Sequence, residues 1–106
     1  YKLKKEKDCD LVVCLSHLGY QYSDNKISDK RLTNESEDID LIIGGHTHTF
    51  LNEPVVFENK KGNDVIVNQV GWAGINLGRL DFNFNKYSKK KLSQSSSITV
   101  TKKTEQ

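Results

Sequence analysis

Two short apolar runs that each end at a histidine constrain the fold of this chain more than any other feature. The first run covers residues 9–16 and is followed by His17, and the second covers residues 38–43 and is followed by His46 and His48. Their length and β-branched content are typical of strands that are buried on both faces. All three histidines of the chain therefore lie where a strand would pass into a loop. Ligand and metal sites commonly form in such loops, just outside the carboxyl ends of strands.

A short helix is expected between the two runs. Ser28 is a typical N-cap residue, and the sequence after it predicts a helix over residues 29–37. A helical crossover is the usual connection between neighbouring parallel strands, so the order strand, helix, strand predicts a parallel βαβ unit. Parallel strands bring their carboxyl ends to the same edge of a sheet. His17 would then share one rim with His46 and His48, which is the arrangement that a common metal centre needs.

The second half of the chain has the pattern of antiparallel hairpins. Residues 55–57 and 65–67 flank a glycine-containing turn at residues 60–63. Residues 80–84 and 98–101 alternate apolar and polar side chains, which is typical of strands with one buried and one solvated face. The chain is therefore expected to be an α+β protein, with a parallel βαβ unit followed by antiparallel hairpins.

Length and composition favour one small globular domain. A chain of 106 residues, with 28% charged side chains of nearly balanced sign, suits a single modest core. It has no run of about eighteen apolar residues and no signal-peptide pattern, so no membrane span is expected. The sequence begins at Tyr1 and contains no methionine, so we expect a processed chain or a fragment. A strand between Cys9 and Cys14 would separate them by roughly 16 Å, beyond the ~7 Å limit for a disulfide, so both are expected to be free thiols.

The net charge of +2 conceals a basic segment at the end of the sequence. Lysines and serines gather in it: Lys86, Lys89, Lys90, Lys91, Ser93, Ser95, Ser96 and Ser97. Apart from Tyr87, no aromatic side chains interleave with them, so no platform for stacking bases is predicted and no nucleic-acid polymer is expected as a partner. Residues 86–106 are instead expected to form a solvated hairpin loop and a final strand, distinct from residues 1–85.

The local sequence around the histidine pair favours a metal site. Neutral imidazole is a good ligand for zinc, iron and other borderline divalent ions, and a His-x-His pair on a tight loop can place its rings on two ions about 3.5–4 Å apart. An isolated His-x-His is a weak motif, because surface or core histidines are commoner. Here Gly44 and Gly45 precede the pair and permit a sharp turn, and a predicted buried strand lies behind it. Together with the matching strand end before His17, these features favour His17, His46 and His48 as metal ligands.

At these residues the chain resembles the calcineurin-like metallophosphoesterases, and within them the bacterial 5′-nucleotidase branch. The resemblance rests on residues 15–19 (LSHLG) and 38–49 (DIDLIIGGHTHT), with further similarity at residues 65–71 (VIVNQVG) and 77–81 (LGRLD). It covers about residues 8–85, which correspond to the carboxyl-terminal half of the family's catalytic domain. The fold that it implies is part of a four-layer α/β/β/α sandwich.

The resemblance also implies a set of metal ligands. In the family, the histidine after the first strand and the first histidine of Gly-His-x-His bind one ion, and the second histidine of the pair binds the other. Carried over, His17 and His46 would share one divalent ion and His48 would bind its neighbour, with zinc, manganese and iron as candidates. The family's other ligands lie upstream, in an Asp-x-His motif, a bridging aspartate and an Asn-His pair, and none is present here. The missing upstream half is therefore an expected partner, no catalytic residue is assigned within this chain, and the chain alone is expected to be inactive.

In the complete enzyme, the implied activity is hydrolysis of small phosphate esters, with 5′-nucleotides as expected substrates and metal-bound hydroxide as the attacking group. The resemblance implies a periplasmic or cell-surface location. Four residues in or beside a glycine-rich loop could contact substrate or serve packing and turn roles: Asn68, Gln69, Trp72 and Asn76. Three alternatives stay open: a noncatalytic module whose histidines bind one metal ion, a domain whose histidines are incidental, and a cyclic phosphodiesterase or sulfur-ester hydrolase on the same scaffold.

Overall fold

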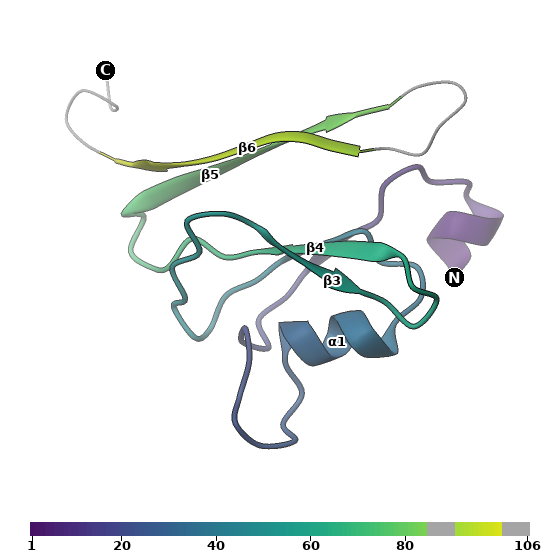
Figure 1. Ribbon diagram of the computed structural model, residues 1–106, viewed down its shortest axis with the longest axis horizontal. Helices are drawn as coiled ribbons and strands as arrows, with labels where there is room; N and C mark the ends of the chain where they lie inside the picture. The colour runs from purple at the N-terminus through teal and green to yellow at the C-terminus, as the bar shows by residue number, and fades with distance from the viewer. Residues whose placement is uncertain (85–90, 101–106) are drawn as a thin grey trace.

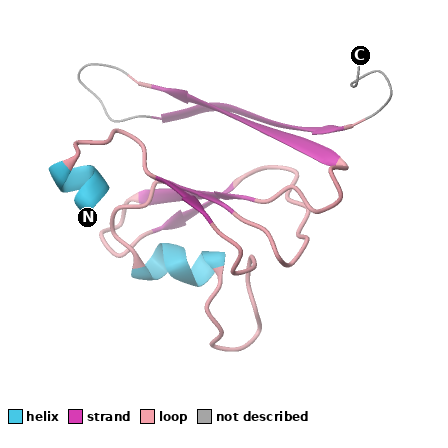
Figure 2. Cartoon of the chain, turned by 180° about the vertical axis from the view of Figure 1, so that it is seen from behind, coloured by secondary structure: helices cyan, strands magenta, loops and turns pink. Residues whose placement is uncertain are grey.

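The computed structural model describes residues 1–84 and 91–100, and for residues 91–94 it describes the backbone alone. In chain order the elements are the π-helical turn η1 (Lys2–Glu6), β1 (Val13–Leu15), α1 (Asp29–Glu35), β2 (Leu41–Ile43), β3 (Val55–Glu58), β4 (Asp64–Asn68), β5 (Asn76–Asn83) and β6 (Lys91–Thr99). They form three layers, with α1 on one side of a sheet built from β1 to β4 and the ribbon of β5 and β6 on the other side (Figures 1 and 2).

The four-stranded sheet has the order β1, β2, β4, β3. β1 runs parallel to β2, and β2 runs parallel to β4, whereas β3 is antiparallel to β4. Because α1 connects β1 to β2, the predicted parallel βαβ unit is confirmed, and the first predicted hairpin is formed by β3 and β4. The carboxyl ends of β1, β2 and β4 consequently meet at one edge of the sheet.

The helix α1 begins where the sequence predicts and ends two residues earlier, at Glu35. The Oγ of Ser28 accepts a hydrogen bond from the Arg31 N–H at 3.2 Å, which satisfies one of the donors left free in the first turn. After Glu35 the backbone returns to an extended conformation at Ser36. Among the residues described, no helix is long and apolar enough to cross a membrane.

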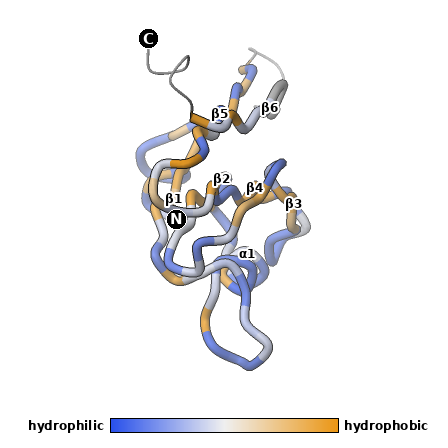
Figure 3. Tube along the Cα trace, turned by 90° about the vertical axis from the view of Figure 1, so that its left-hand side faces the viewer, coloured by the Kyte–Doolittle hydropathy of each residue, from blue (hydrophilic) through white to orange (hydrophobic). Residues whose placement is uncertain are grey.

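The core lies between α1 and the sheet. Ile42 of β2 and Val65 and Val67 of β4 are fully buried there, and Leu32 of α1 packs against them. Figure 3 shows hydrophobic residues along these strands and mostly hydrophilic residues in the loop that precedes α1. Burying a side chain of this size contributes about 1.5–3 kcal/mol, so this cluster holds α1 against the sheet.

The prediction that β1 is buried on both faces is wrong. Val13 and Leu15 have exposed fractions of 43% and 79%, and Ile43, which is the register partner of Leu15, is 43% exposed. Because side chains alternate along a strand, these three lie on the face of the sheet opposite α1. No described residue covers them fully on that face. β1 and β2 also span three residues each, which is shorter than the predicted runs.

β5 and β6 form an antiparallel ribbon in which Leu77 pairs with Ile98, so a second hairpin is present. β6 begins at Lys91, and the serines after it therefore lie in a strand rather than in the predicted solvated loop. Ladder hydrogen bonds use only the backbone, so a serine-rich segment can pair wherever a partner strand is available. Several residues of the predicted loop lie outside the described residues: Lys86, Tyr87, Lys89 and Lys90. The predicted boundary between residues 1–85 and 86–106 also lies outside the described residues.

Candidate functional site

The rings of His17 and His46 face each other at the edge where β1 and β2 end. Leu15 and Ile43, the last residues of these strands, are register partners, and the Ser16 N–H donates to the Ile43 carbonyl at 2.9 Å. The two loops therefore leave the sheet side by side. The Nδ1 of His46 lies 3.2 Å from the Nε2 of His17, and the ring centroids are 4.9 Å apart at an angle of 68°.

This separation suits two ligands of one metal ion. Two imidazole nitrogens that each lie about 2.0–2.1 Å from a tetrahedral ion are roughly 3.3 Å apart, close to the 3.2 Å between His46 Nδ1 and His17 Nε2. The same separation fits a hydrogen bond in which one neutral ring donates to the other. The pair can therefore hold either an ion or a shared proton, and imidazole donors suit the borderline divalent metals.

His48 shares the loop with His46 but faces another way. Both residues have a left-handed backbone, with φ of 69° at His46 and 53° at His48, a region that residues other than glycine seldom adopt. The ring of His48 stacks on Trp72 with centroids 5.4 Å apart and planes 10° apart. Within the described part of the chain, no three His, Cys, Asp or Glu side chains converge to hold a metal ion. The rim therefore brings together two of the three predicted ligands, and the assignment of all three stays a prediction.

The two histidine loops are joined by a hydrogen-bond network centred on Thr47. Its Oγ1 accepts from the Tyr20 N–H at 3.0 Å and lies 2.8 Å from the Oγ1 of Thr49. The Thr49 N–H donates to the Oε1 of Gln69 at 2.5 Å, so the end of β4 also holds the loop. Nothing in the sequence identified Thr47 and Thr49 beforehand, because their role depends on which segments the fold places beside them.

The four candidate substrate-side residues divide into two groups. Asn68, Gln69 and Asn76 line a shallow pocket of about 230 Å³ beside Gly44. Gln69 accepts a hydrogen bond from the histidine loop, whereas the buried Oδ1 of Asn68 has no hydrogen-bond partner within the part of the chain that the structure describes. Trp72 lies apart from this pocket and is 56% exposed, with one face on His48. The glycine-rich loop thus returns to the histidine rim.

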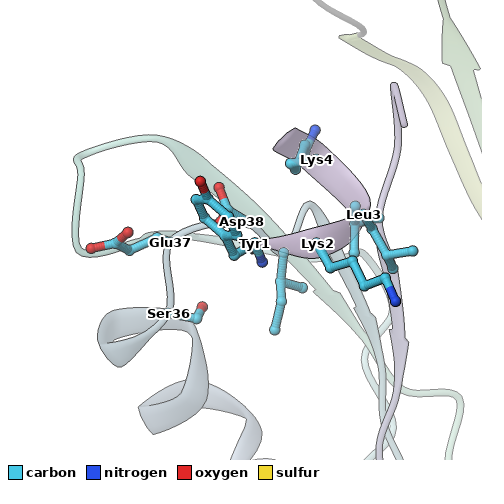
Figure 4. A pocket seen from close by; sticks show the side chains of 9 residues that line it. Tyr1, Lys2, Leu3, Lys4, Ser36, Glu37 and Asp38 are labelled. Atoms are coloured by element: carbon cyan, nitrogen blue, oxygen red, sulfur yellow. Dashed lines mark ion pairs between the residues drawn. The ribbon is translucent and has the colours of Figure 1, made fainter. Parts of the chain in front are cut away.

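A larger pocket of about 480 Å³ lies away from the histidines. It is lined by η1 and by residues that precede β1 and β2, including Val12 and Ile39, so it lies at the amino ends of these strands. Figure 4 shows Tyr1 beside Asp38, and the terminal amine of Tyr1 is 3.2 Å from the Asp38 carboxylate. Size alone therefore does not identify the candidate site, because the residues with metal-binding chemistry lie at the opposite edge.

A buried carboxyl group lies beneath the histidine rim. Asp29, the first residue of α1, is fully buried, and its Oδ1 accepts a hydrogen bond from the Ser16 hydroxyl at 2.5 Å. Burial raises the pKa of Asp29, and the Ser16 hydrogen bond opposes this shift. Burial also raises the pKa of Cys14, with a smaller contribution from the Asp29 charge. The sequence suggests only a first-turn role for Asp29, so its place under the site was not predicted.

Comparisons with known proteins point to one group of enzymes. No family model matches the chain. It is 34% identical over 83 residues to the trifunctional nucleotide phosphoesterase protein YfkN of Bacillus subtilis, an alignment that covers 78% of this chain and 5% of YfkN. It is 28% identical over 116 residues to a 5′-nucleotidase-related protein of Glossina morsitans morsitans, with coverage of 97% and 20%. The chain therefore spans a fifth or less of the length of these two relatives.

A solved structure agrees with these relatives. The crystal structure of a 5′-nucleotidase precursor from Thermus thermophilus matches 95% of this chain with a TM-score of 0.79 and 26% identity, and the match covers 21% of that protein. The α+β fold with its parallel unit and antiparallel hairpins is thereby confirmed as that of a 5′-nucleotidase domain. On these sequence and structural similarities, the chain belongs to the 5′-nucleotidase-like branch of the metallophosphoesterase superfamily.

Proposed function

We propose that this chain is part of a metal-dependent phosphoesterase that hydrolyses small phosphate esters, with 5′-nucleotides as substrates. The observation that carries the proposal is the 3.2 Å separation of the His17 and His46 nitrogens at the carboxyl ends of two parallel strands. The names of the relatives, which describe a nucleotide phosphoesterase and 5′-nucleotidases, support the choice of substrate.

The proposed ligands are His17 and His46 for one divalent ion and His48 for a second, with zinc, manganese and iron as candidates. When bound, such a pair of ions supplies Lewis-acid polarisation of phosphoryl oxygens and lowers the pKa of water. The chain's own contribution is to orient the imidazoles. The hydrogen bonds of Thr47 join the two loops, and the stacked Trp72 limits rotation of the His48 ring.

We also propose that the remaining ligands come from polypeptide outside this sequence. Two facing histidines leave a tetrahedral or octahedral ion short of ligands, and the described residues hold no third histidine, cysteine or carboxylate beside them. The relatives are at least about five times as long as the matched segment, which leaves ample chain for an upstream half. The same family membership motivates a periplasmic or cell-surface location for the whole protein.

On the substrate side, Asn68 is the best candidate among the four predicted residues. Its buried Oδ1 has no partner among residues 1–84 and the described side chains of residues 95–100, and a buried amide oxygen without a hydrogen bond is unfavourable unless a ligand or ordered water satisfies it. Asn68 and Asn76 line the same pocket as Gly44, and Gly44 lies two residues before His46. Trp72 offers an exposed aromatic face next to His48.

The test is an assay of the natural polypeptide that contains this sequence, with 5′-nucleotides and aryl phosphates as substrates. We expect turnover that is lost with a chelator and restored by divalent ions. His46→Ala should lower kcat/KM by about a hundredfold or more, the scale of losing one electrostatic contact to a transition state. Asn34→Ala, at an exposed position on α1, is the control and should leave activity unchanged. Retention of a single metal ion with no phosphoesterase turnover would contradict the proposal and favour a noncatalytic metal-binding module.

A further inference from the structure

The buried carboxyl of Asp29 connects to both segments that carry the facing histidines. On one side, its Oδ1 accepts from the Ser16 hydroxyl at 2.5 Å, and the Oγ of Ser16 in turn accepts from the Leu18 N–H at 3.2 Å. Ser16 and Leu18 are the residues immediately before and after His17. The carboxyl is therefore linked through one hydroxyl to the backbone on both sides of this ligand.

On its other side, the carboxyl lies directly under the glycine turn before His46. A Cβ added to Gly44 would overlap the Oδ2 of Asp29, far inside van der Waals contact. The Gly44 N–H is already bonded to the Asn68 carbonyl at 2.9 Å, so the turn has little freedom to move away. The turn also contacts the first ligand, because a Cβ added to Gly45 would lie 3.4 Å from the Nδ1 of His17.

The helix holds Asp29 in this place. Its N–H donates to the Gly19 carbonyl at 2.7 Å, and the next residue, Lys30, donates to the Tyr20 carbonyl at 3.1 Å. The N-cap of α1 is supplied separately by Ser28, so capping does not require the side chain of Asp29. Among the described residues nothing donates a hydrogen bond to Oδ2 of this buried carboxyl, which is unfavourable for stability and makes a purely structural role a poor explanation for an acidic residue here.

We propose that Asp29 is the positioning residue that sets the distance between His17 and His46, by fixing Ser16 on one side and Gly44 on the other. The inference rests on the proposed function, in which these two histidines share a metal ion. Groups that orient metal ligands commonly change metal affinity about 10–100-fold when they are removed. Asp29 touches neither substrate nor metal in this account and acts only through the two segments that it separates.

The test measures Co²⁺ binding by visible absorption in the natural polypeptide, well below its unfolding temperature. Asp29→Ala should weaken Co²⁺ binding by about tenfold or more and change the ligand-field bands. Asp29→Asn keeps an oxygen toward Ser16 and the volume under Gly44, so it should restore affinity to within a small factor of wild type. Asp24→Ala, at an exposed aspartate in the loop before α1, is the matched control and should bind Co²⁺ as wild type does.

Two further variants keep the test decisive if Asp29→Ala does not fold. Ser16→Ala removes only the hydroxyl that links the carboxyl to the His17 loop and should weaken Co²⁺ binding several-fold. Gly44→Ala should weaken it too, and combining Gly44→Ala with Asp29→Ala should cost less than the sum of the two changes, because the overlapping atoms are gone.

The outcomes separate this inference from the proposed function. Wild-type Co²⁺ affinity and spectrum in both Asp29→Ala and Ser16→Ala, with only a lower unfolding temperature, would overturn the positioning role and leave the metal site intact. A wild-type protein that binds no Co²⁺ would overturn the proposed function and this inference with it.

Discussion

At the residue scale, the histidine loop is held in an unfavourable backbone conformation by its side-chain contacts. Non-glycine residues in the left-handed region cost on the order of 1 kcal/mol each, and such residues cluster at functional sites. Here His46 and His48 both adopt it, with Thr47 between them. Because Thr47 is bonded to the His17 loop, its hydroxyl is the contact that most directly opposes relaxation of this strain.

Thr47→Val should therefore destabilise the protein. The change keeps the shape of the side chain but leaves the partly buried Tyr20 N–H without its acceptor, for an expected loss of about 1–3 kcal/mol in the free energy of unfolding. Urea denaturation of the natural polypeptide measures it. Thr47→Ser retains the hydroxyl and should recover most of the loss, whereas equal losses in both variants would show that the hydroxyl is not responsible.

A pH-dependent stability follows from the raised pKa of Asp29. Burial makes the folded state hold this proton more tightly than the unfolded state, whose aspartates titrate near pH 3.9. The contribution of Asp29 to stability is therefore fully present below that pH and is lost as pH rises through the folded-state pKa. Asp29→Asn removes the titrating carboxyl and with it this pH dependence. The metal-free variant should therefore gain stability relative to wild type as pH rises from about 4.

Urea denaturation at a series of pH values measures this difference. Asp24→Asn, at an exposed aspartate, should stay at a nearly constant offset from wild type over the same range. A constant offset for Asp29→Asn as well would contradict a raised pKa at that position.

At the element scale, the β1–α1–β2 unit could be predicted because short stretches of sequence indicate each of its elements. The apolar runs indicate the strands, Ser28 indicates the start of the helix, and the crossover rule gives the parallel pairing that the register of Leu15 with Ile43 confirms. Burial of the strand faces could not be predicted in the same way. Whether Val13 is covered depends on what packs on that face, which is a property of the assembled layers rather than of the strand.

In the site too, some features follow from the local sequence and others depend on how the elements pack together. The position of the histidines at strand ends follows from the sequence, and so does the placement of His17 and His46 on one rim. The hydrogen bonds that join the segments around them involve Asp29, Gln69 and Thr47, which are distant from one another in sequence. Their roles arise only when the helix and the ends of the strands have come together.

Full burial of one isoleucine and partial exposure of another predict unequal effects of truncation. Ile42→Ala removes a fully buried side chain between α1 and the sheet and should cost about 2–5 kcal/mol. Ile75→Ala, at an isoleucine that is 42% exposed, should cost about 0.5 kcal/mol or less. Thermal or urea unfolding of the two variants measures the contrast, and similar losses for both would contradict tight packing of Ile42 against Val65 and Val67.

At the scale of the whole molecule, the three layers leave apolar surface uncovered. Val13, Leu15 and Ile43 remain exposed on the face of the sheet opposite α1. Figure 3 shows the β5–β6 ribbon on that side. Exposed apolar side chains on neighbouring strands, such as the register partners Leu15 and Ile43, are typical of an interface. We expect further polypeptide to complete the layer, in keeping with a four-layer sandwich, and the same polypeptide to supply the remaining metal ligands.

Residues 1–106 produced alone should accordingly bind divalent metal weakly and show no turnover of nucleotides or aryl phosphates. Metal affinity from calorimetric titration and turnover from phosphate release measure this. The natural polypeptide, assayed in parallel, is the positive control. Robust phosphoesterase activity from the 106 residues alone would show that the ligands expected from elsewhere are not needed.

The central claim is that His17 and His46 share one metal ion, and anomalous X-ray diffraction from crystals of the natural polypeptide grown with Zn²⁺ or Mn²⁺ tests it most directly. We predict a peak about 2.0–2.2 Å from both the Nε2 of His17 and the Nδ1 of His46, with a second peak beside His48. Anomalous peaks elsewhere in the molecule, with the two facing rings joined only by a hydrogen bond, would contradict the account.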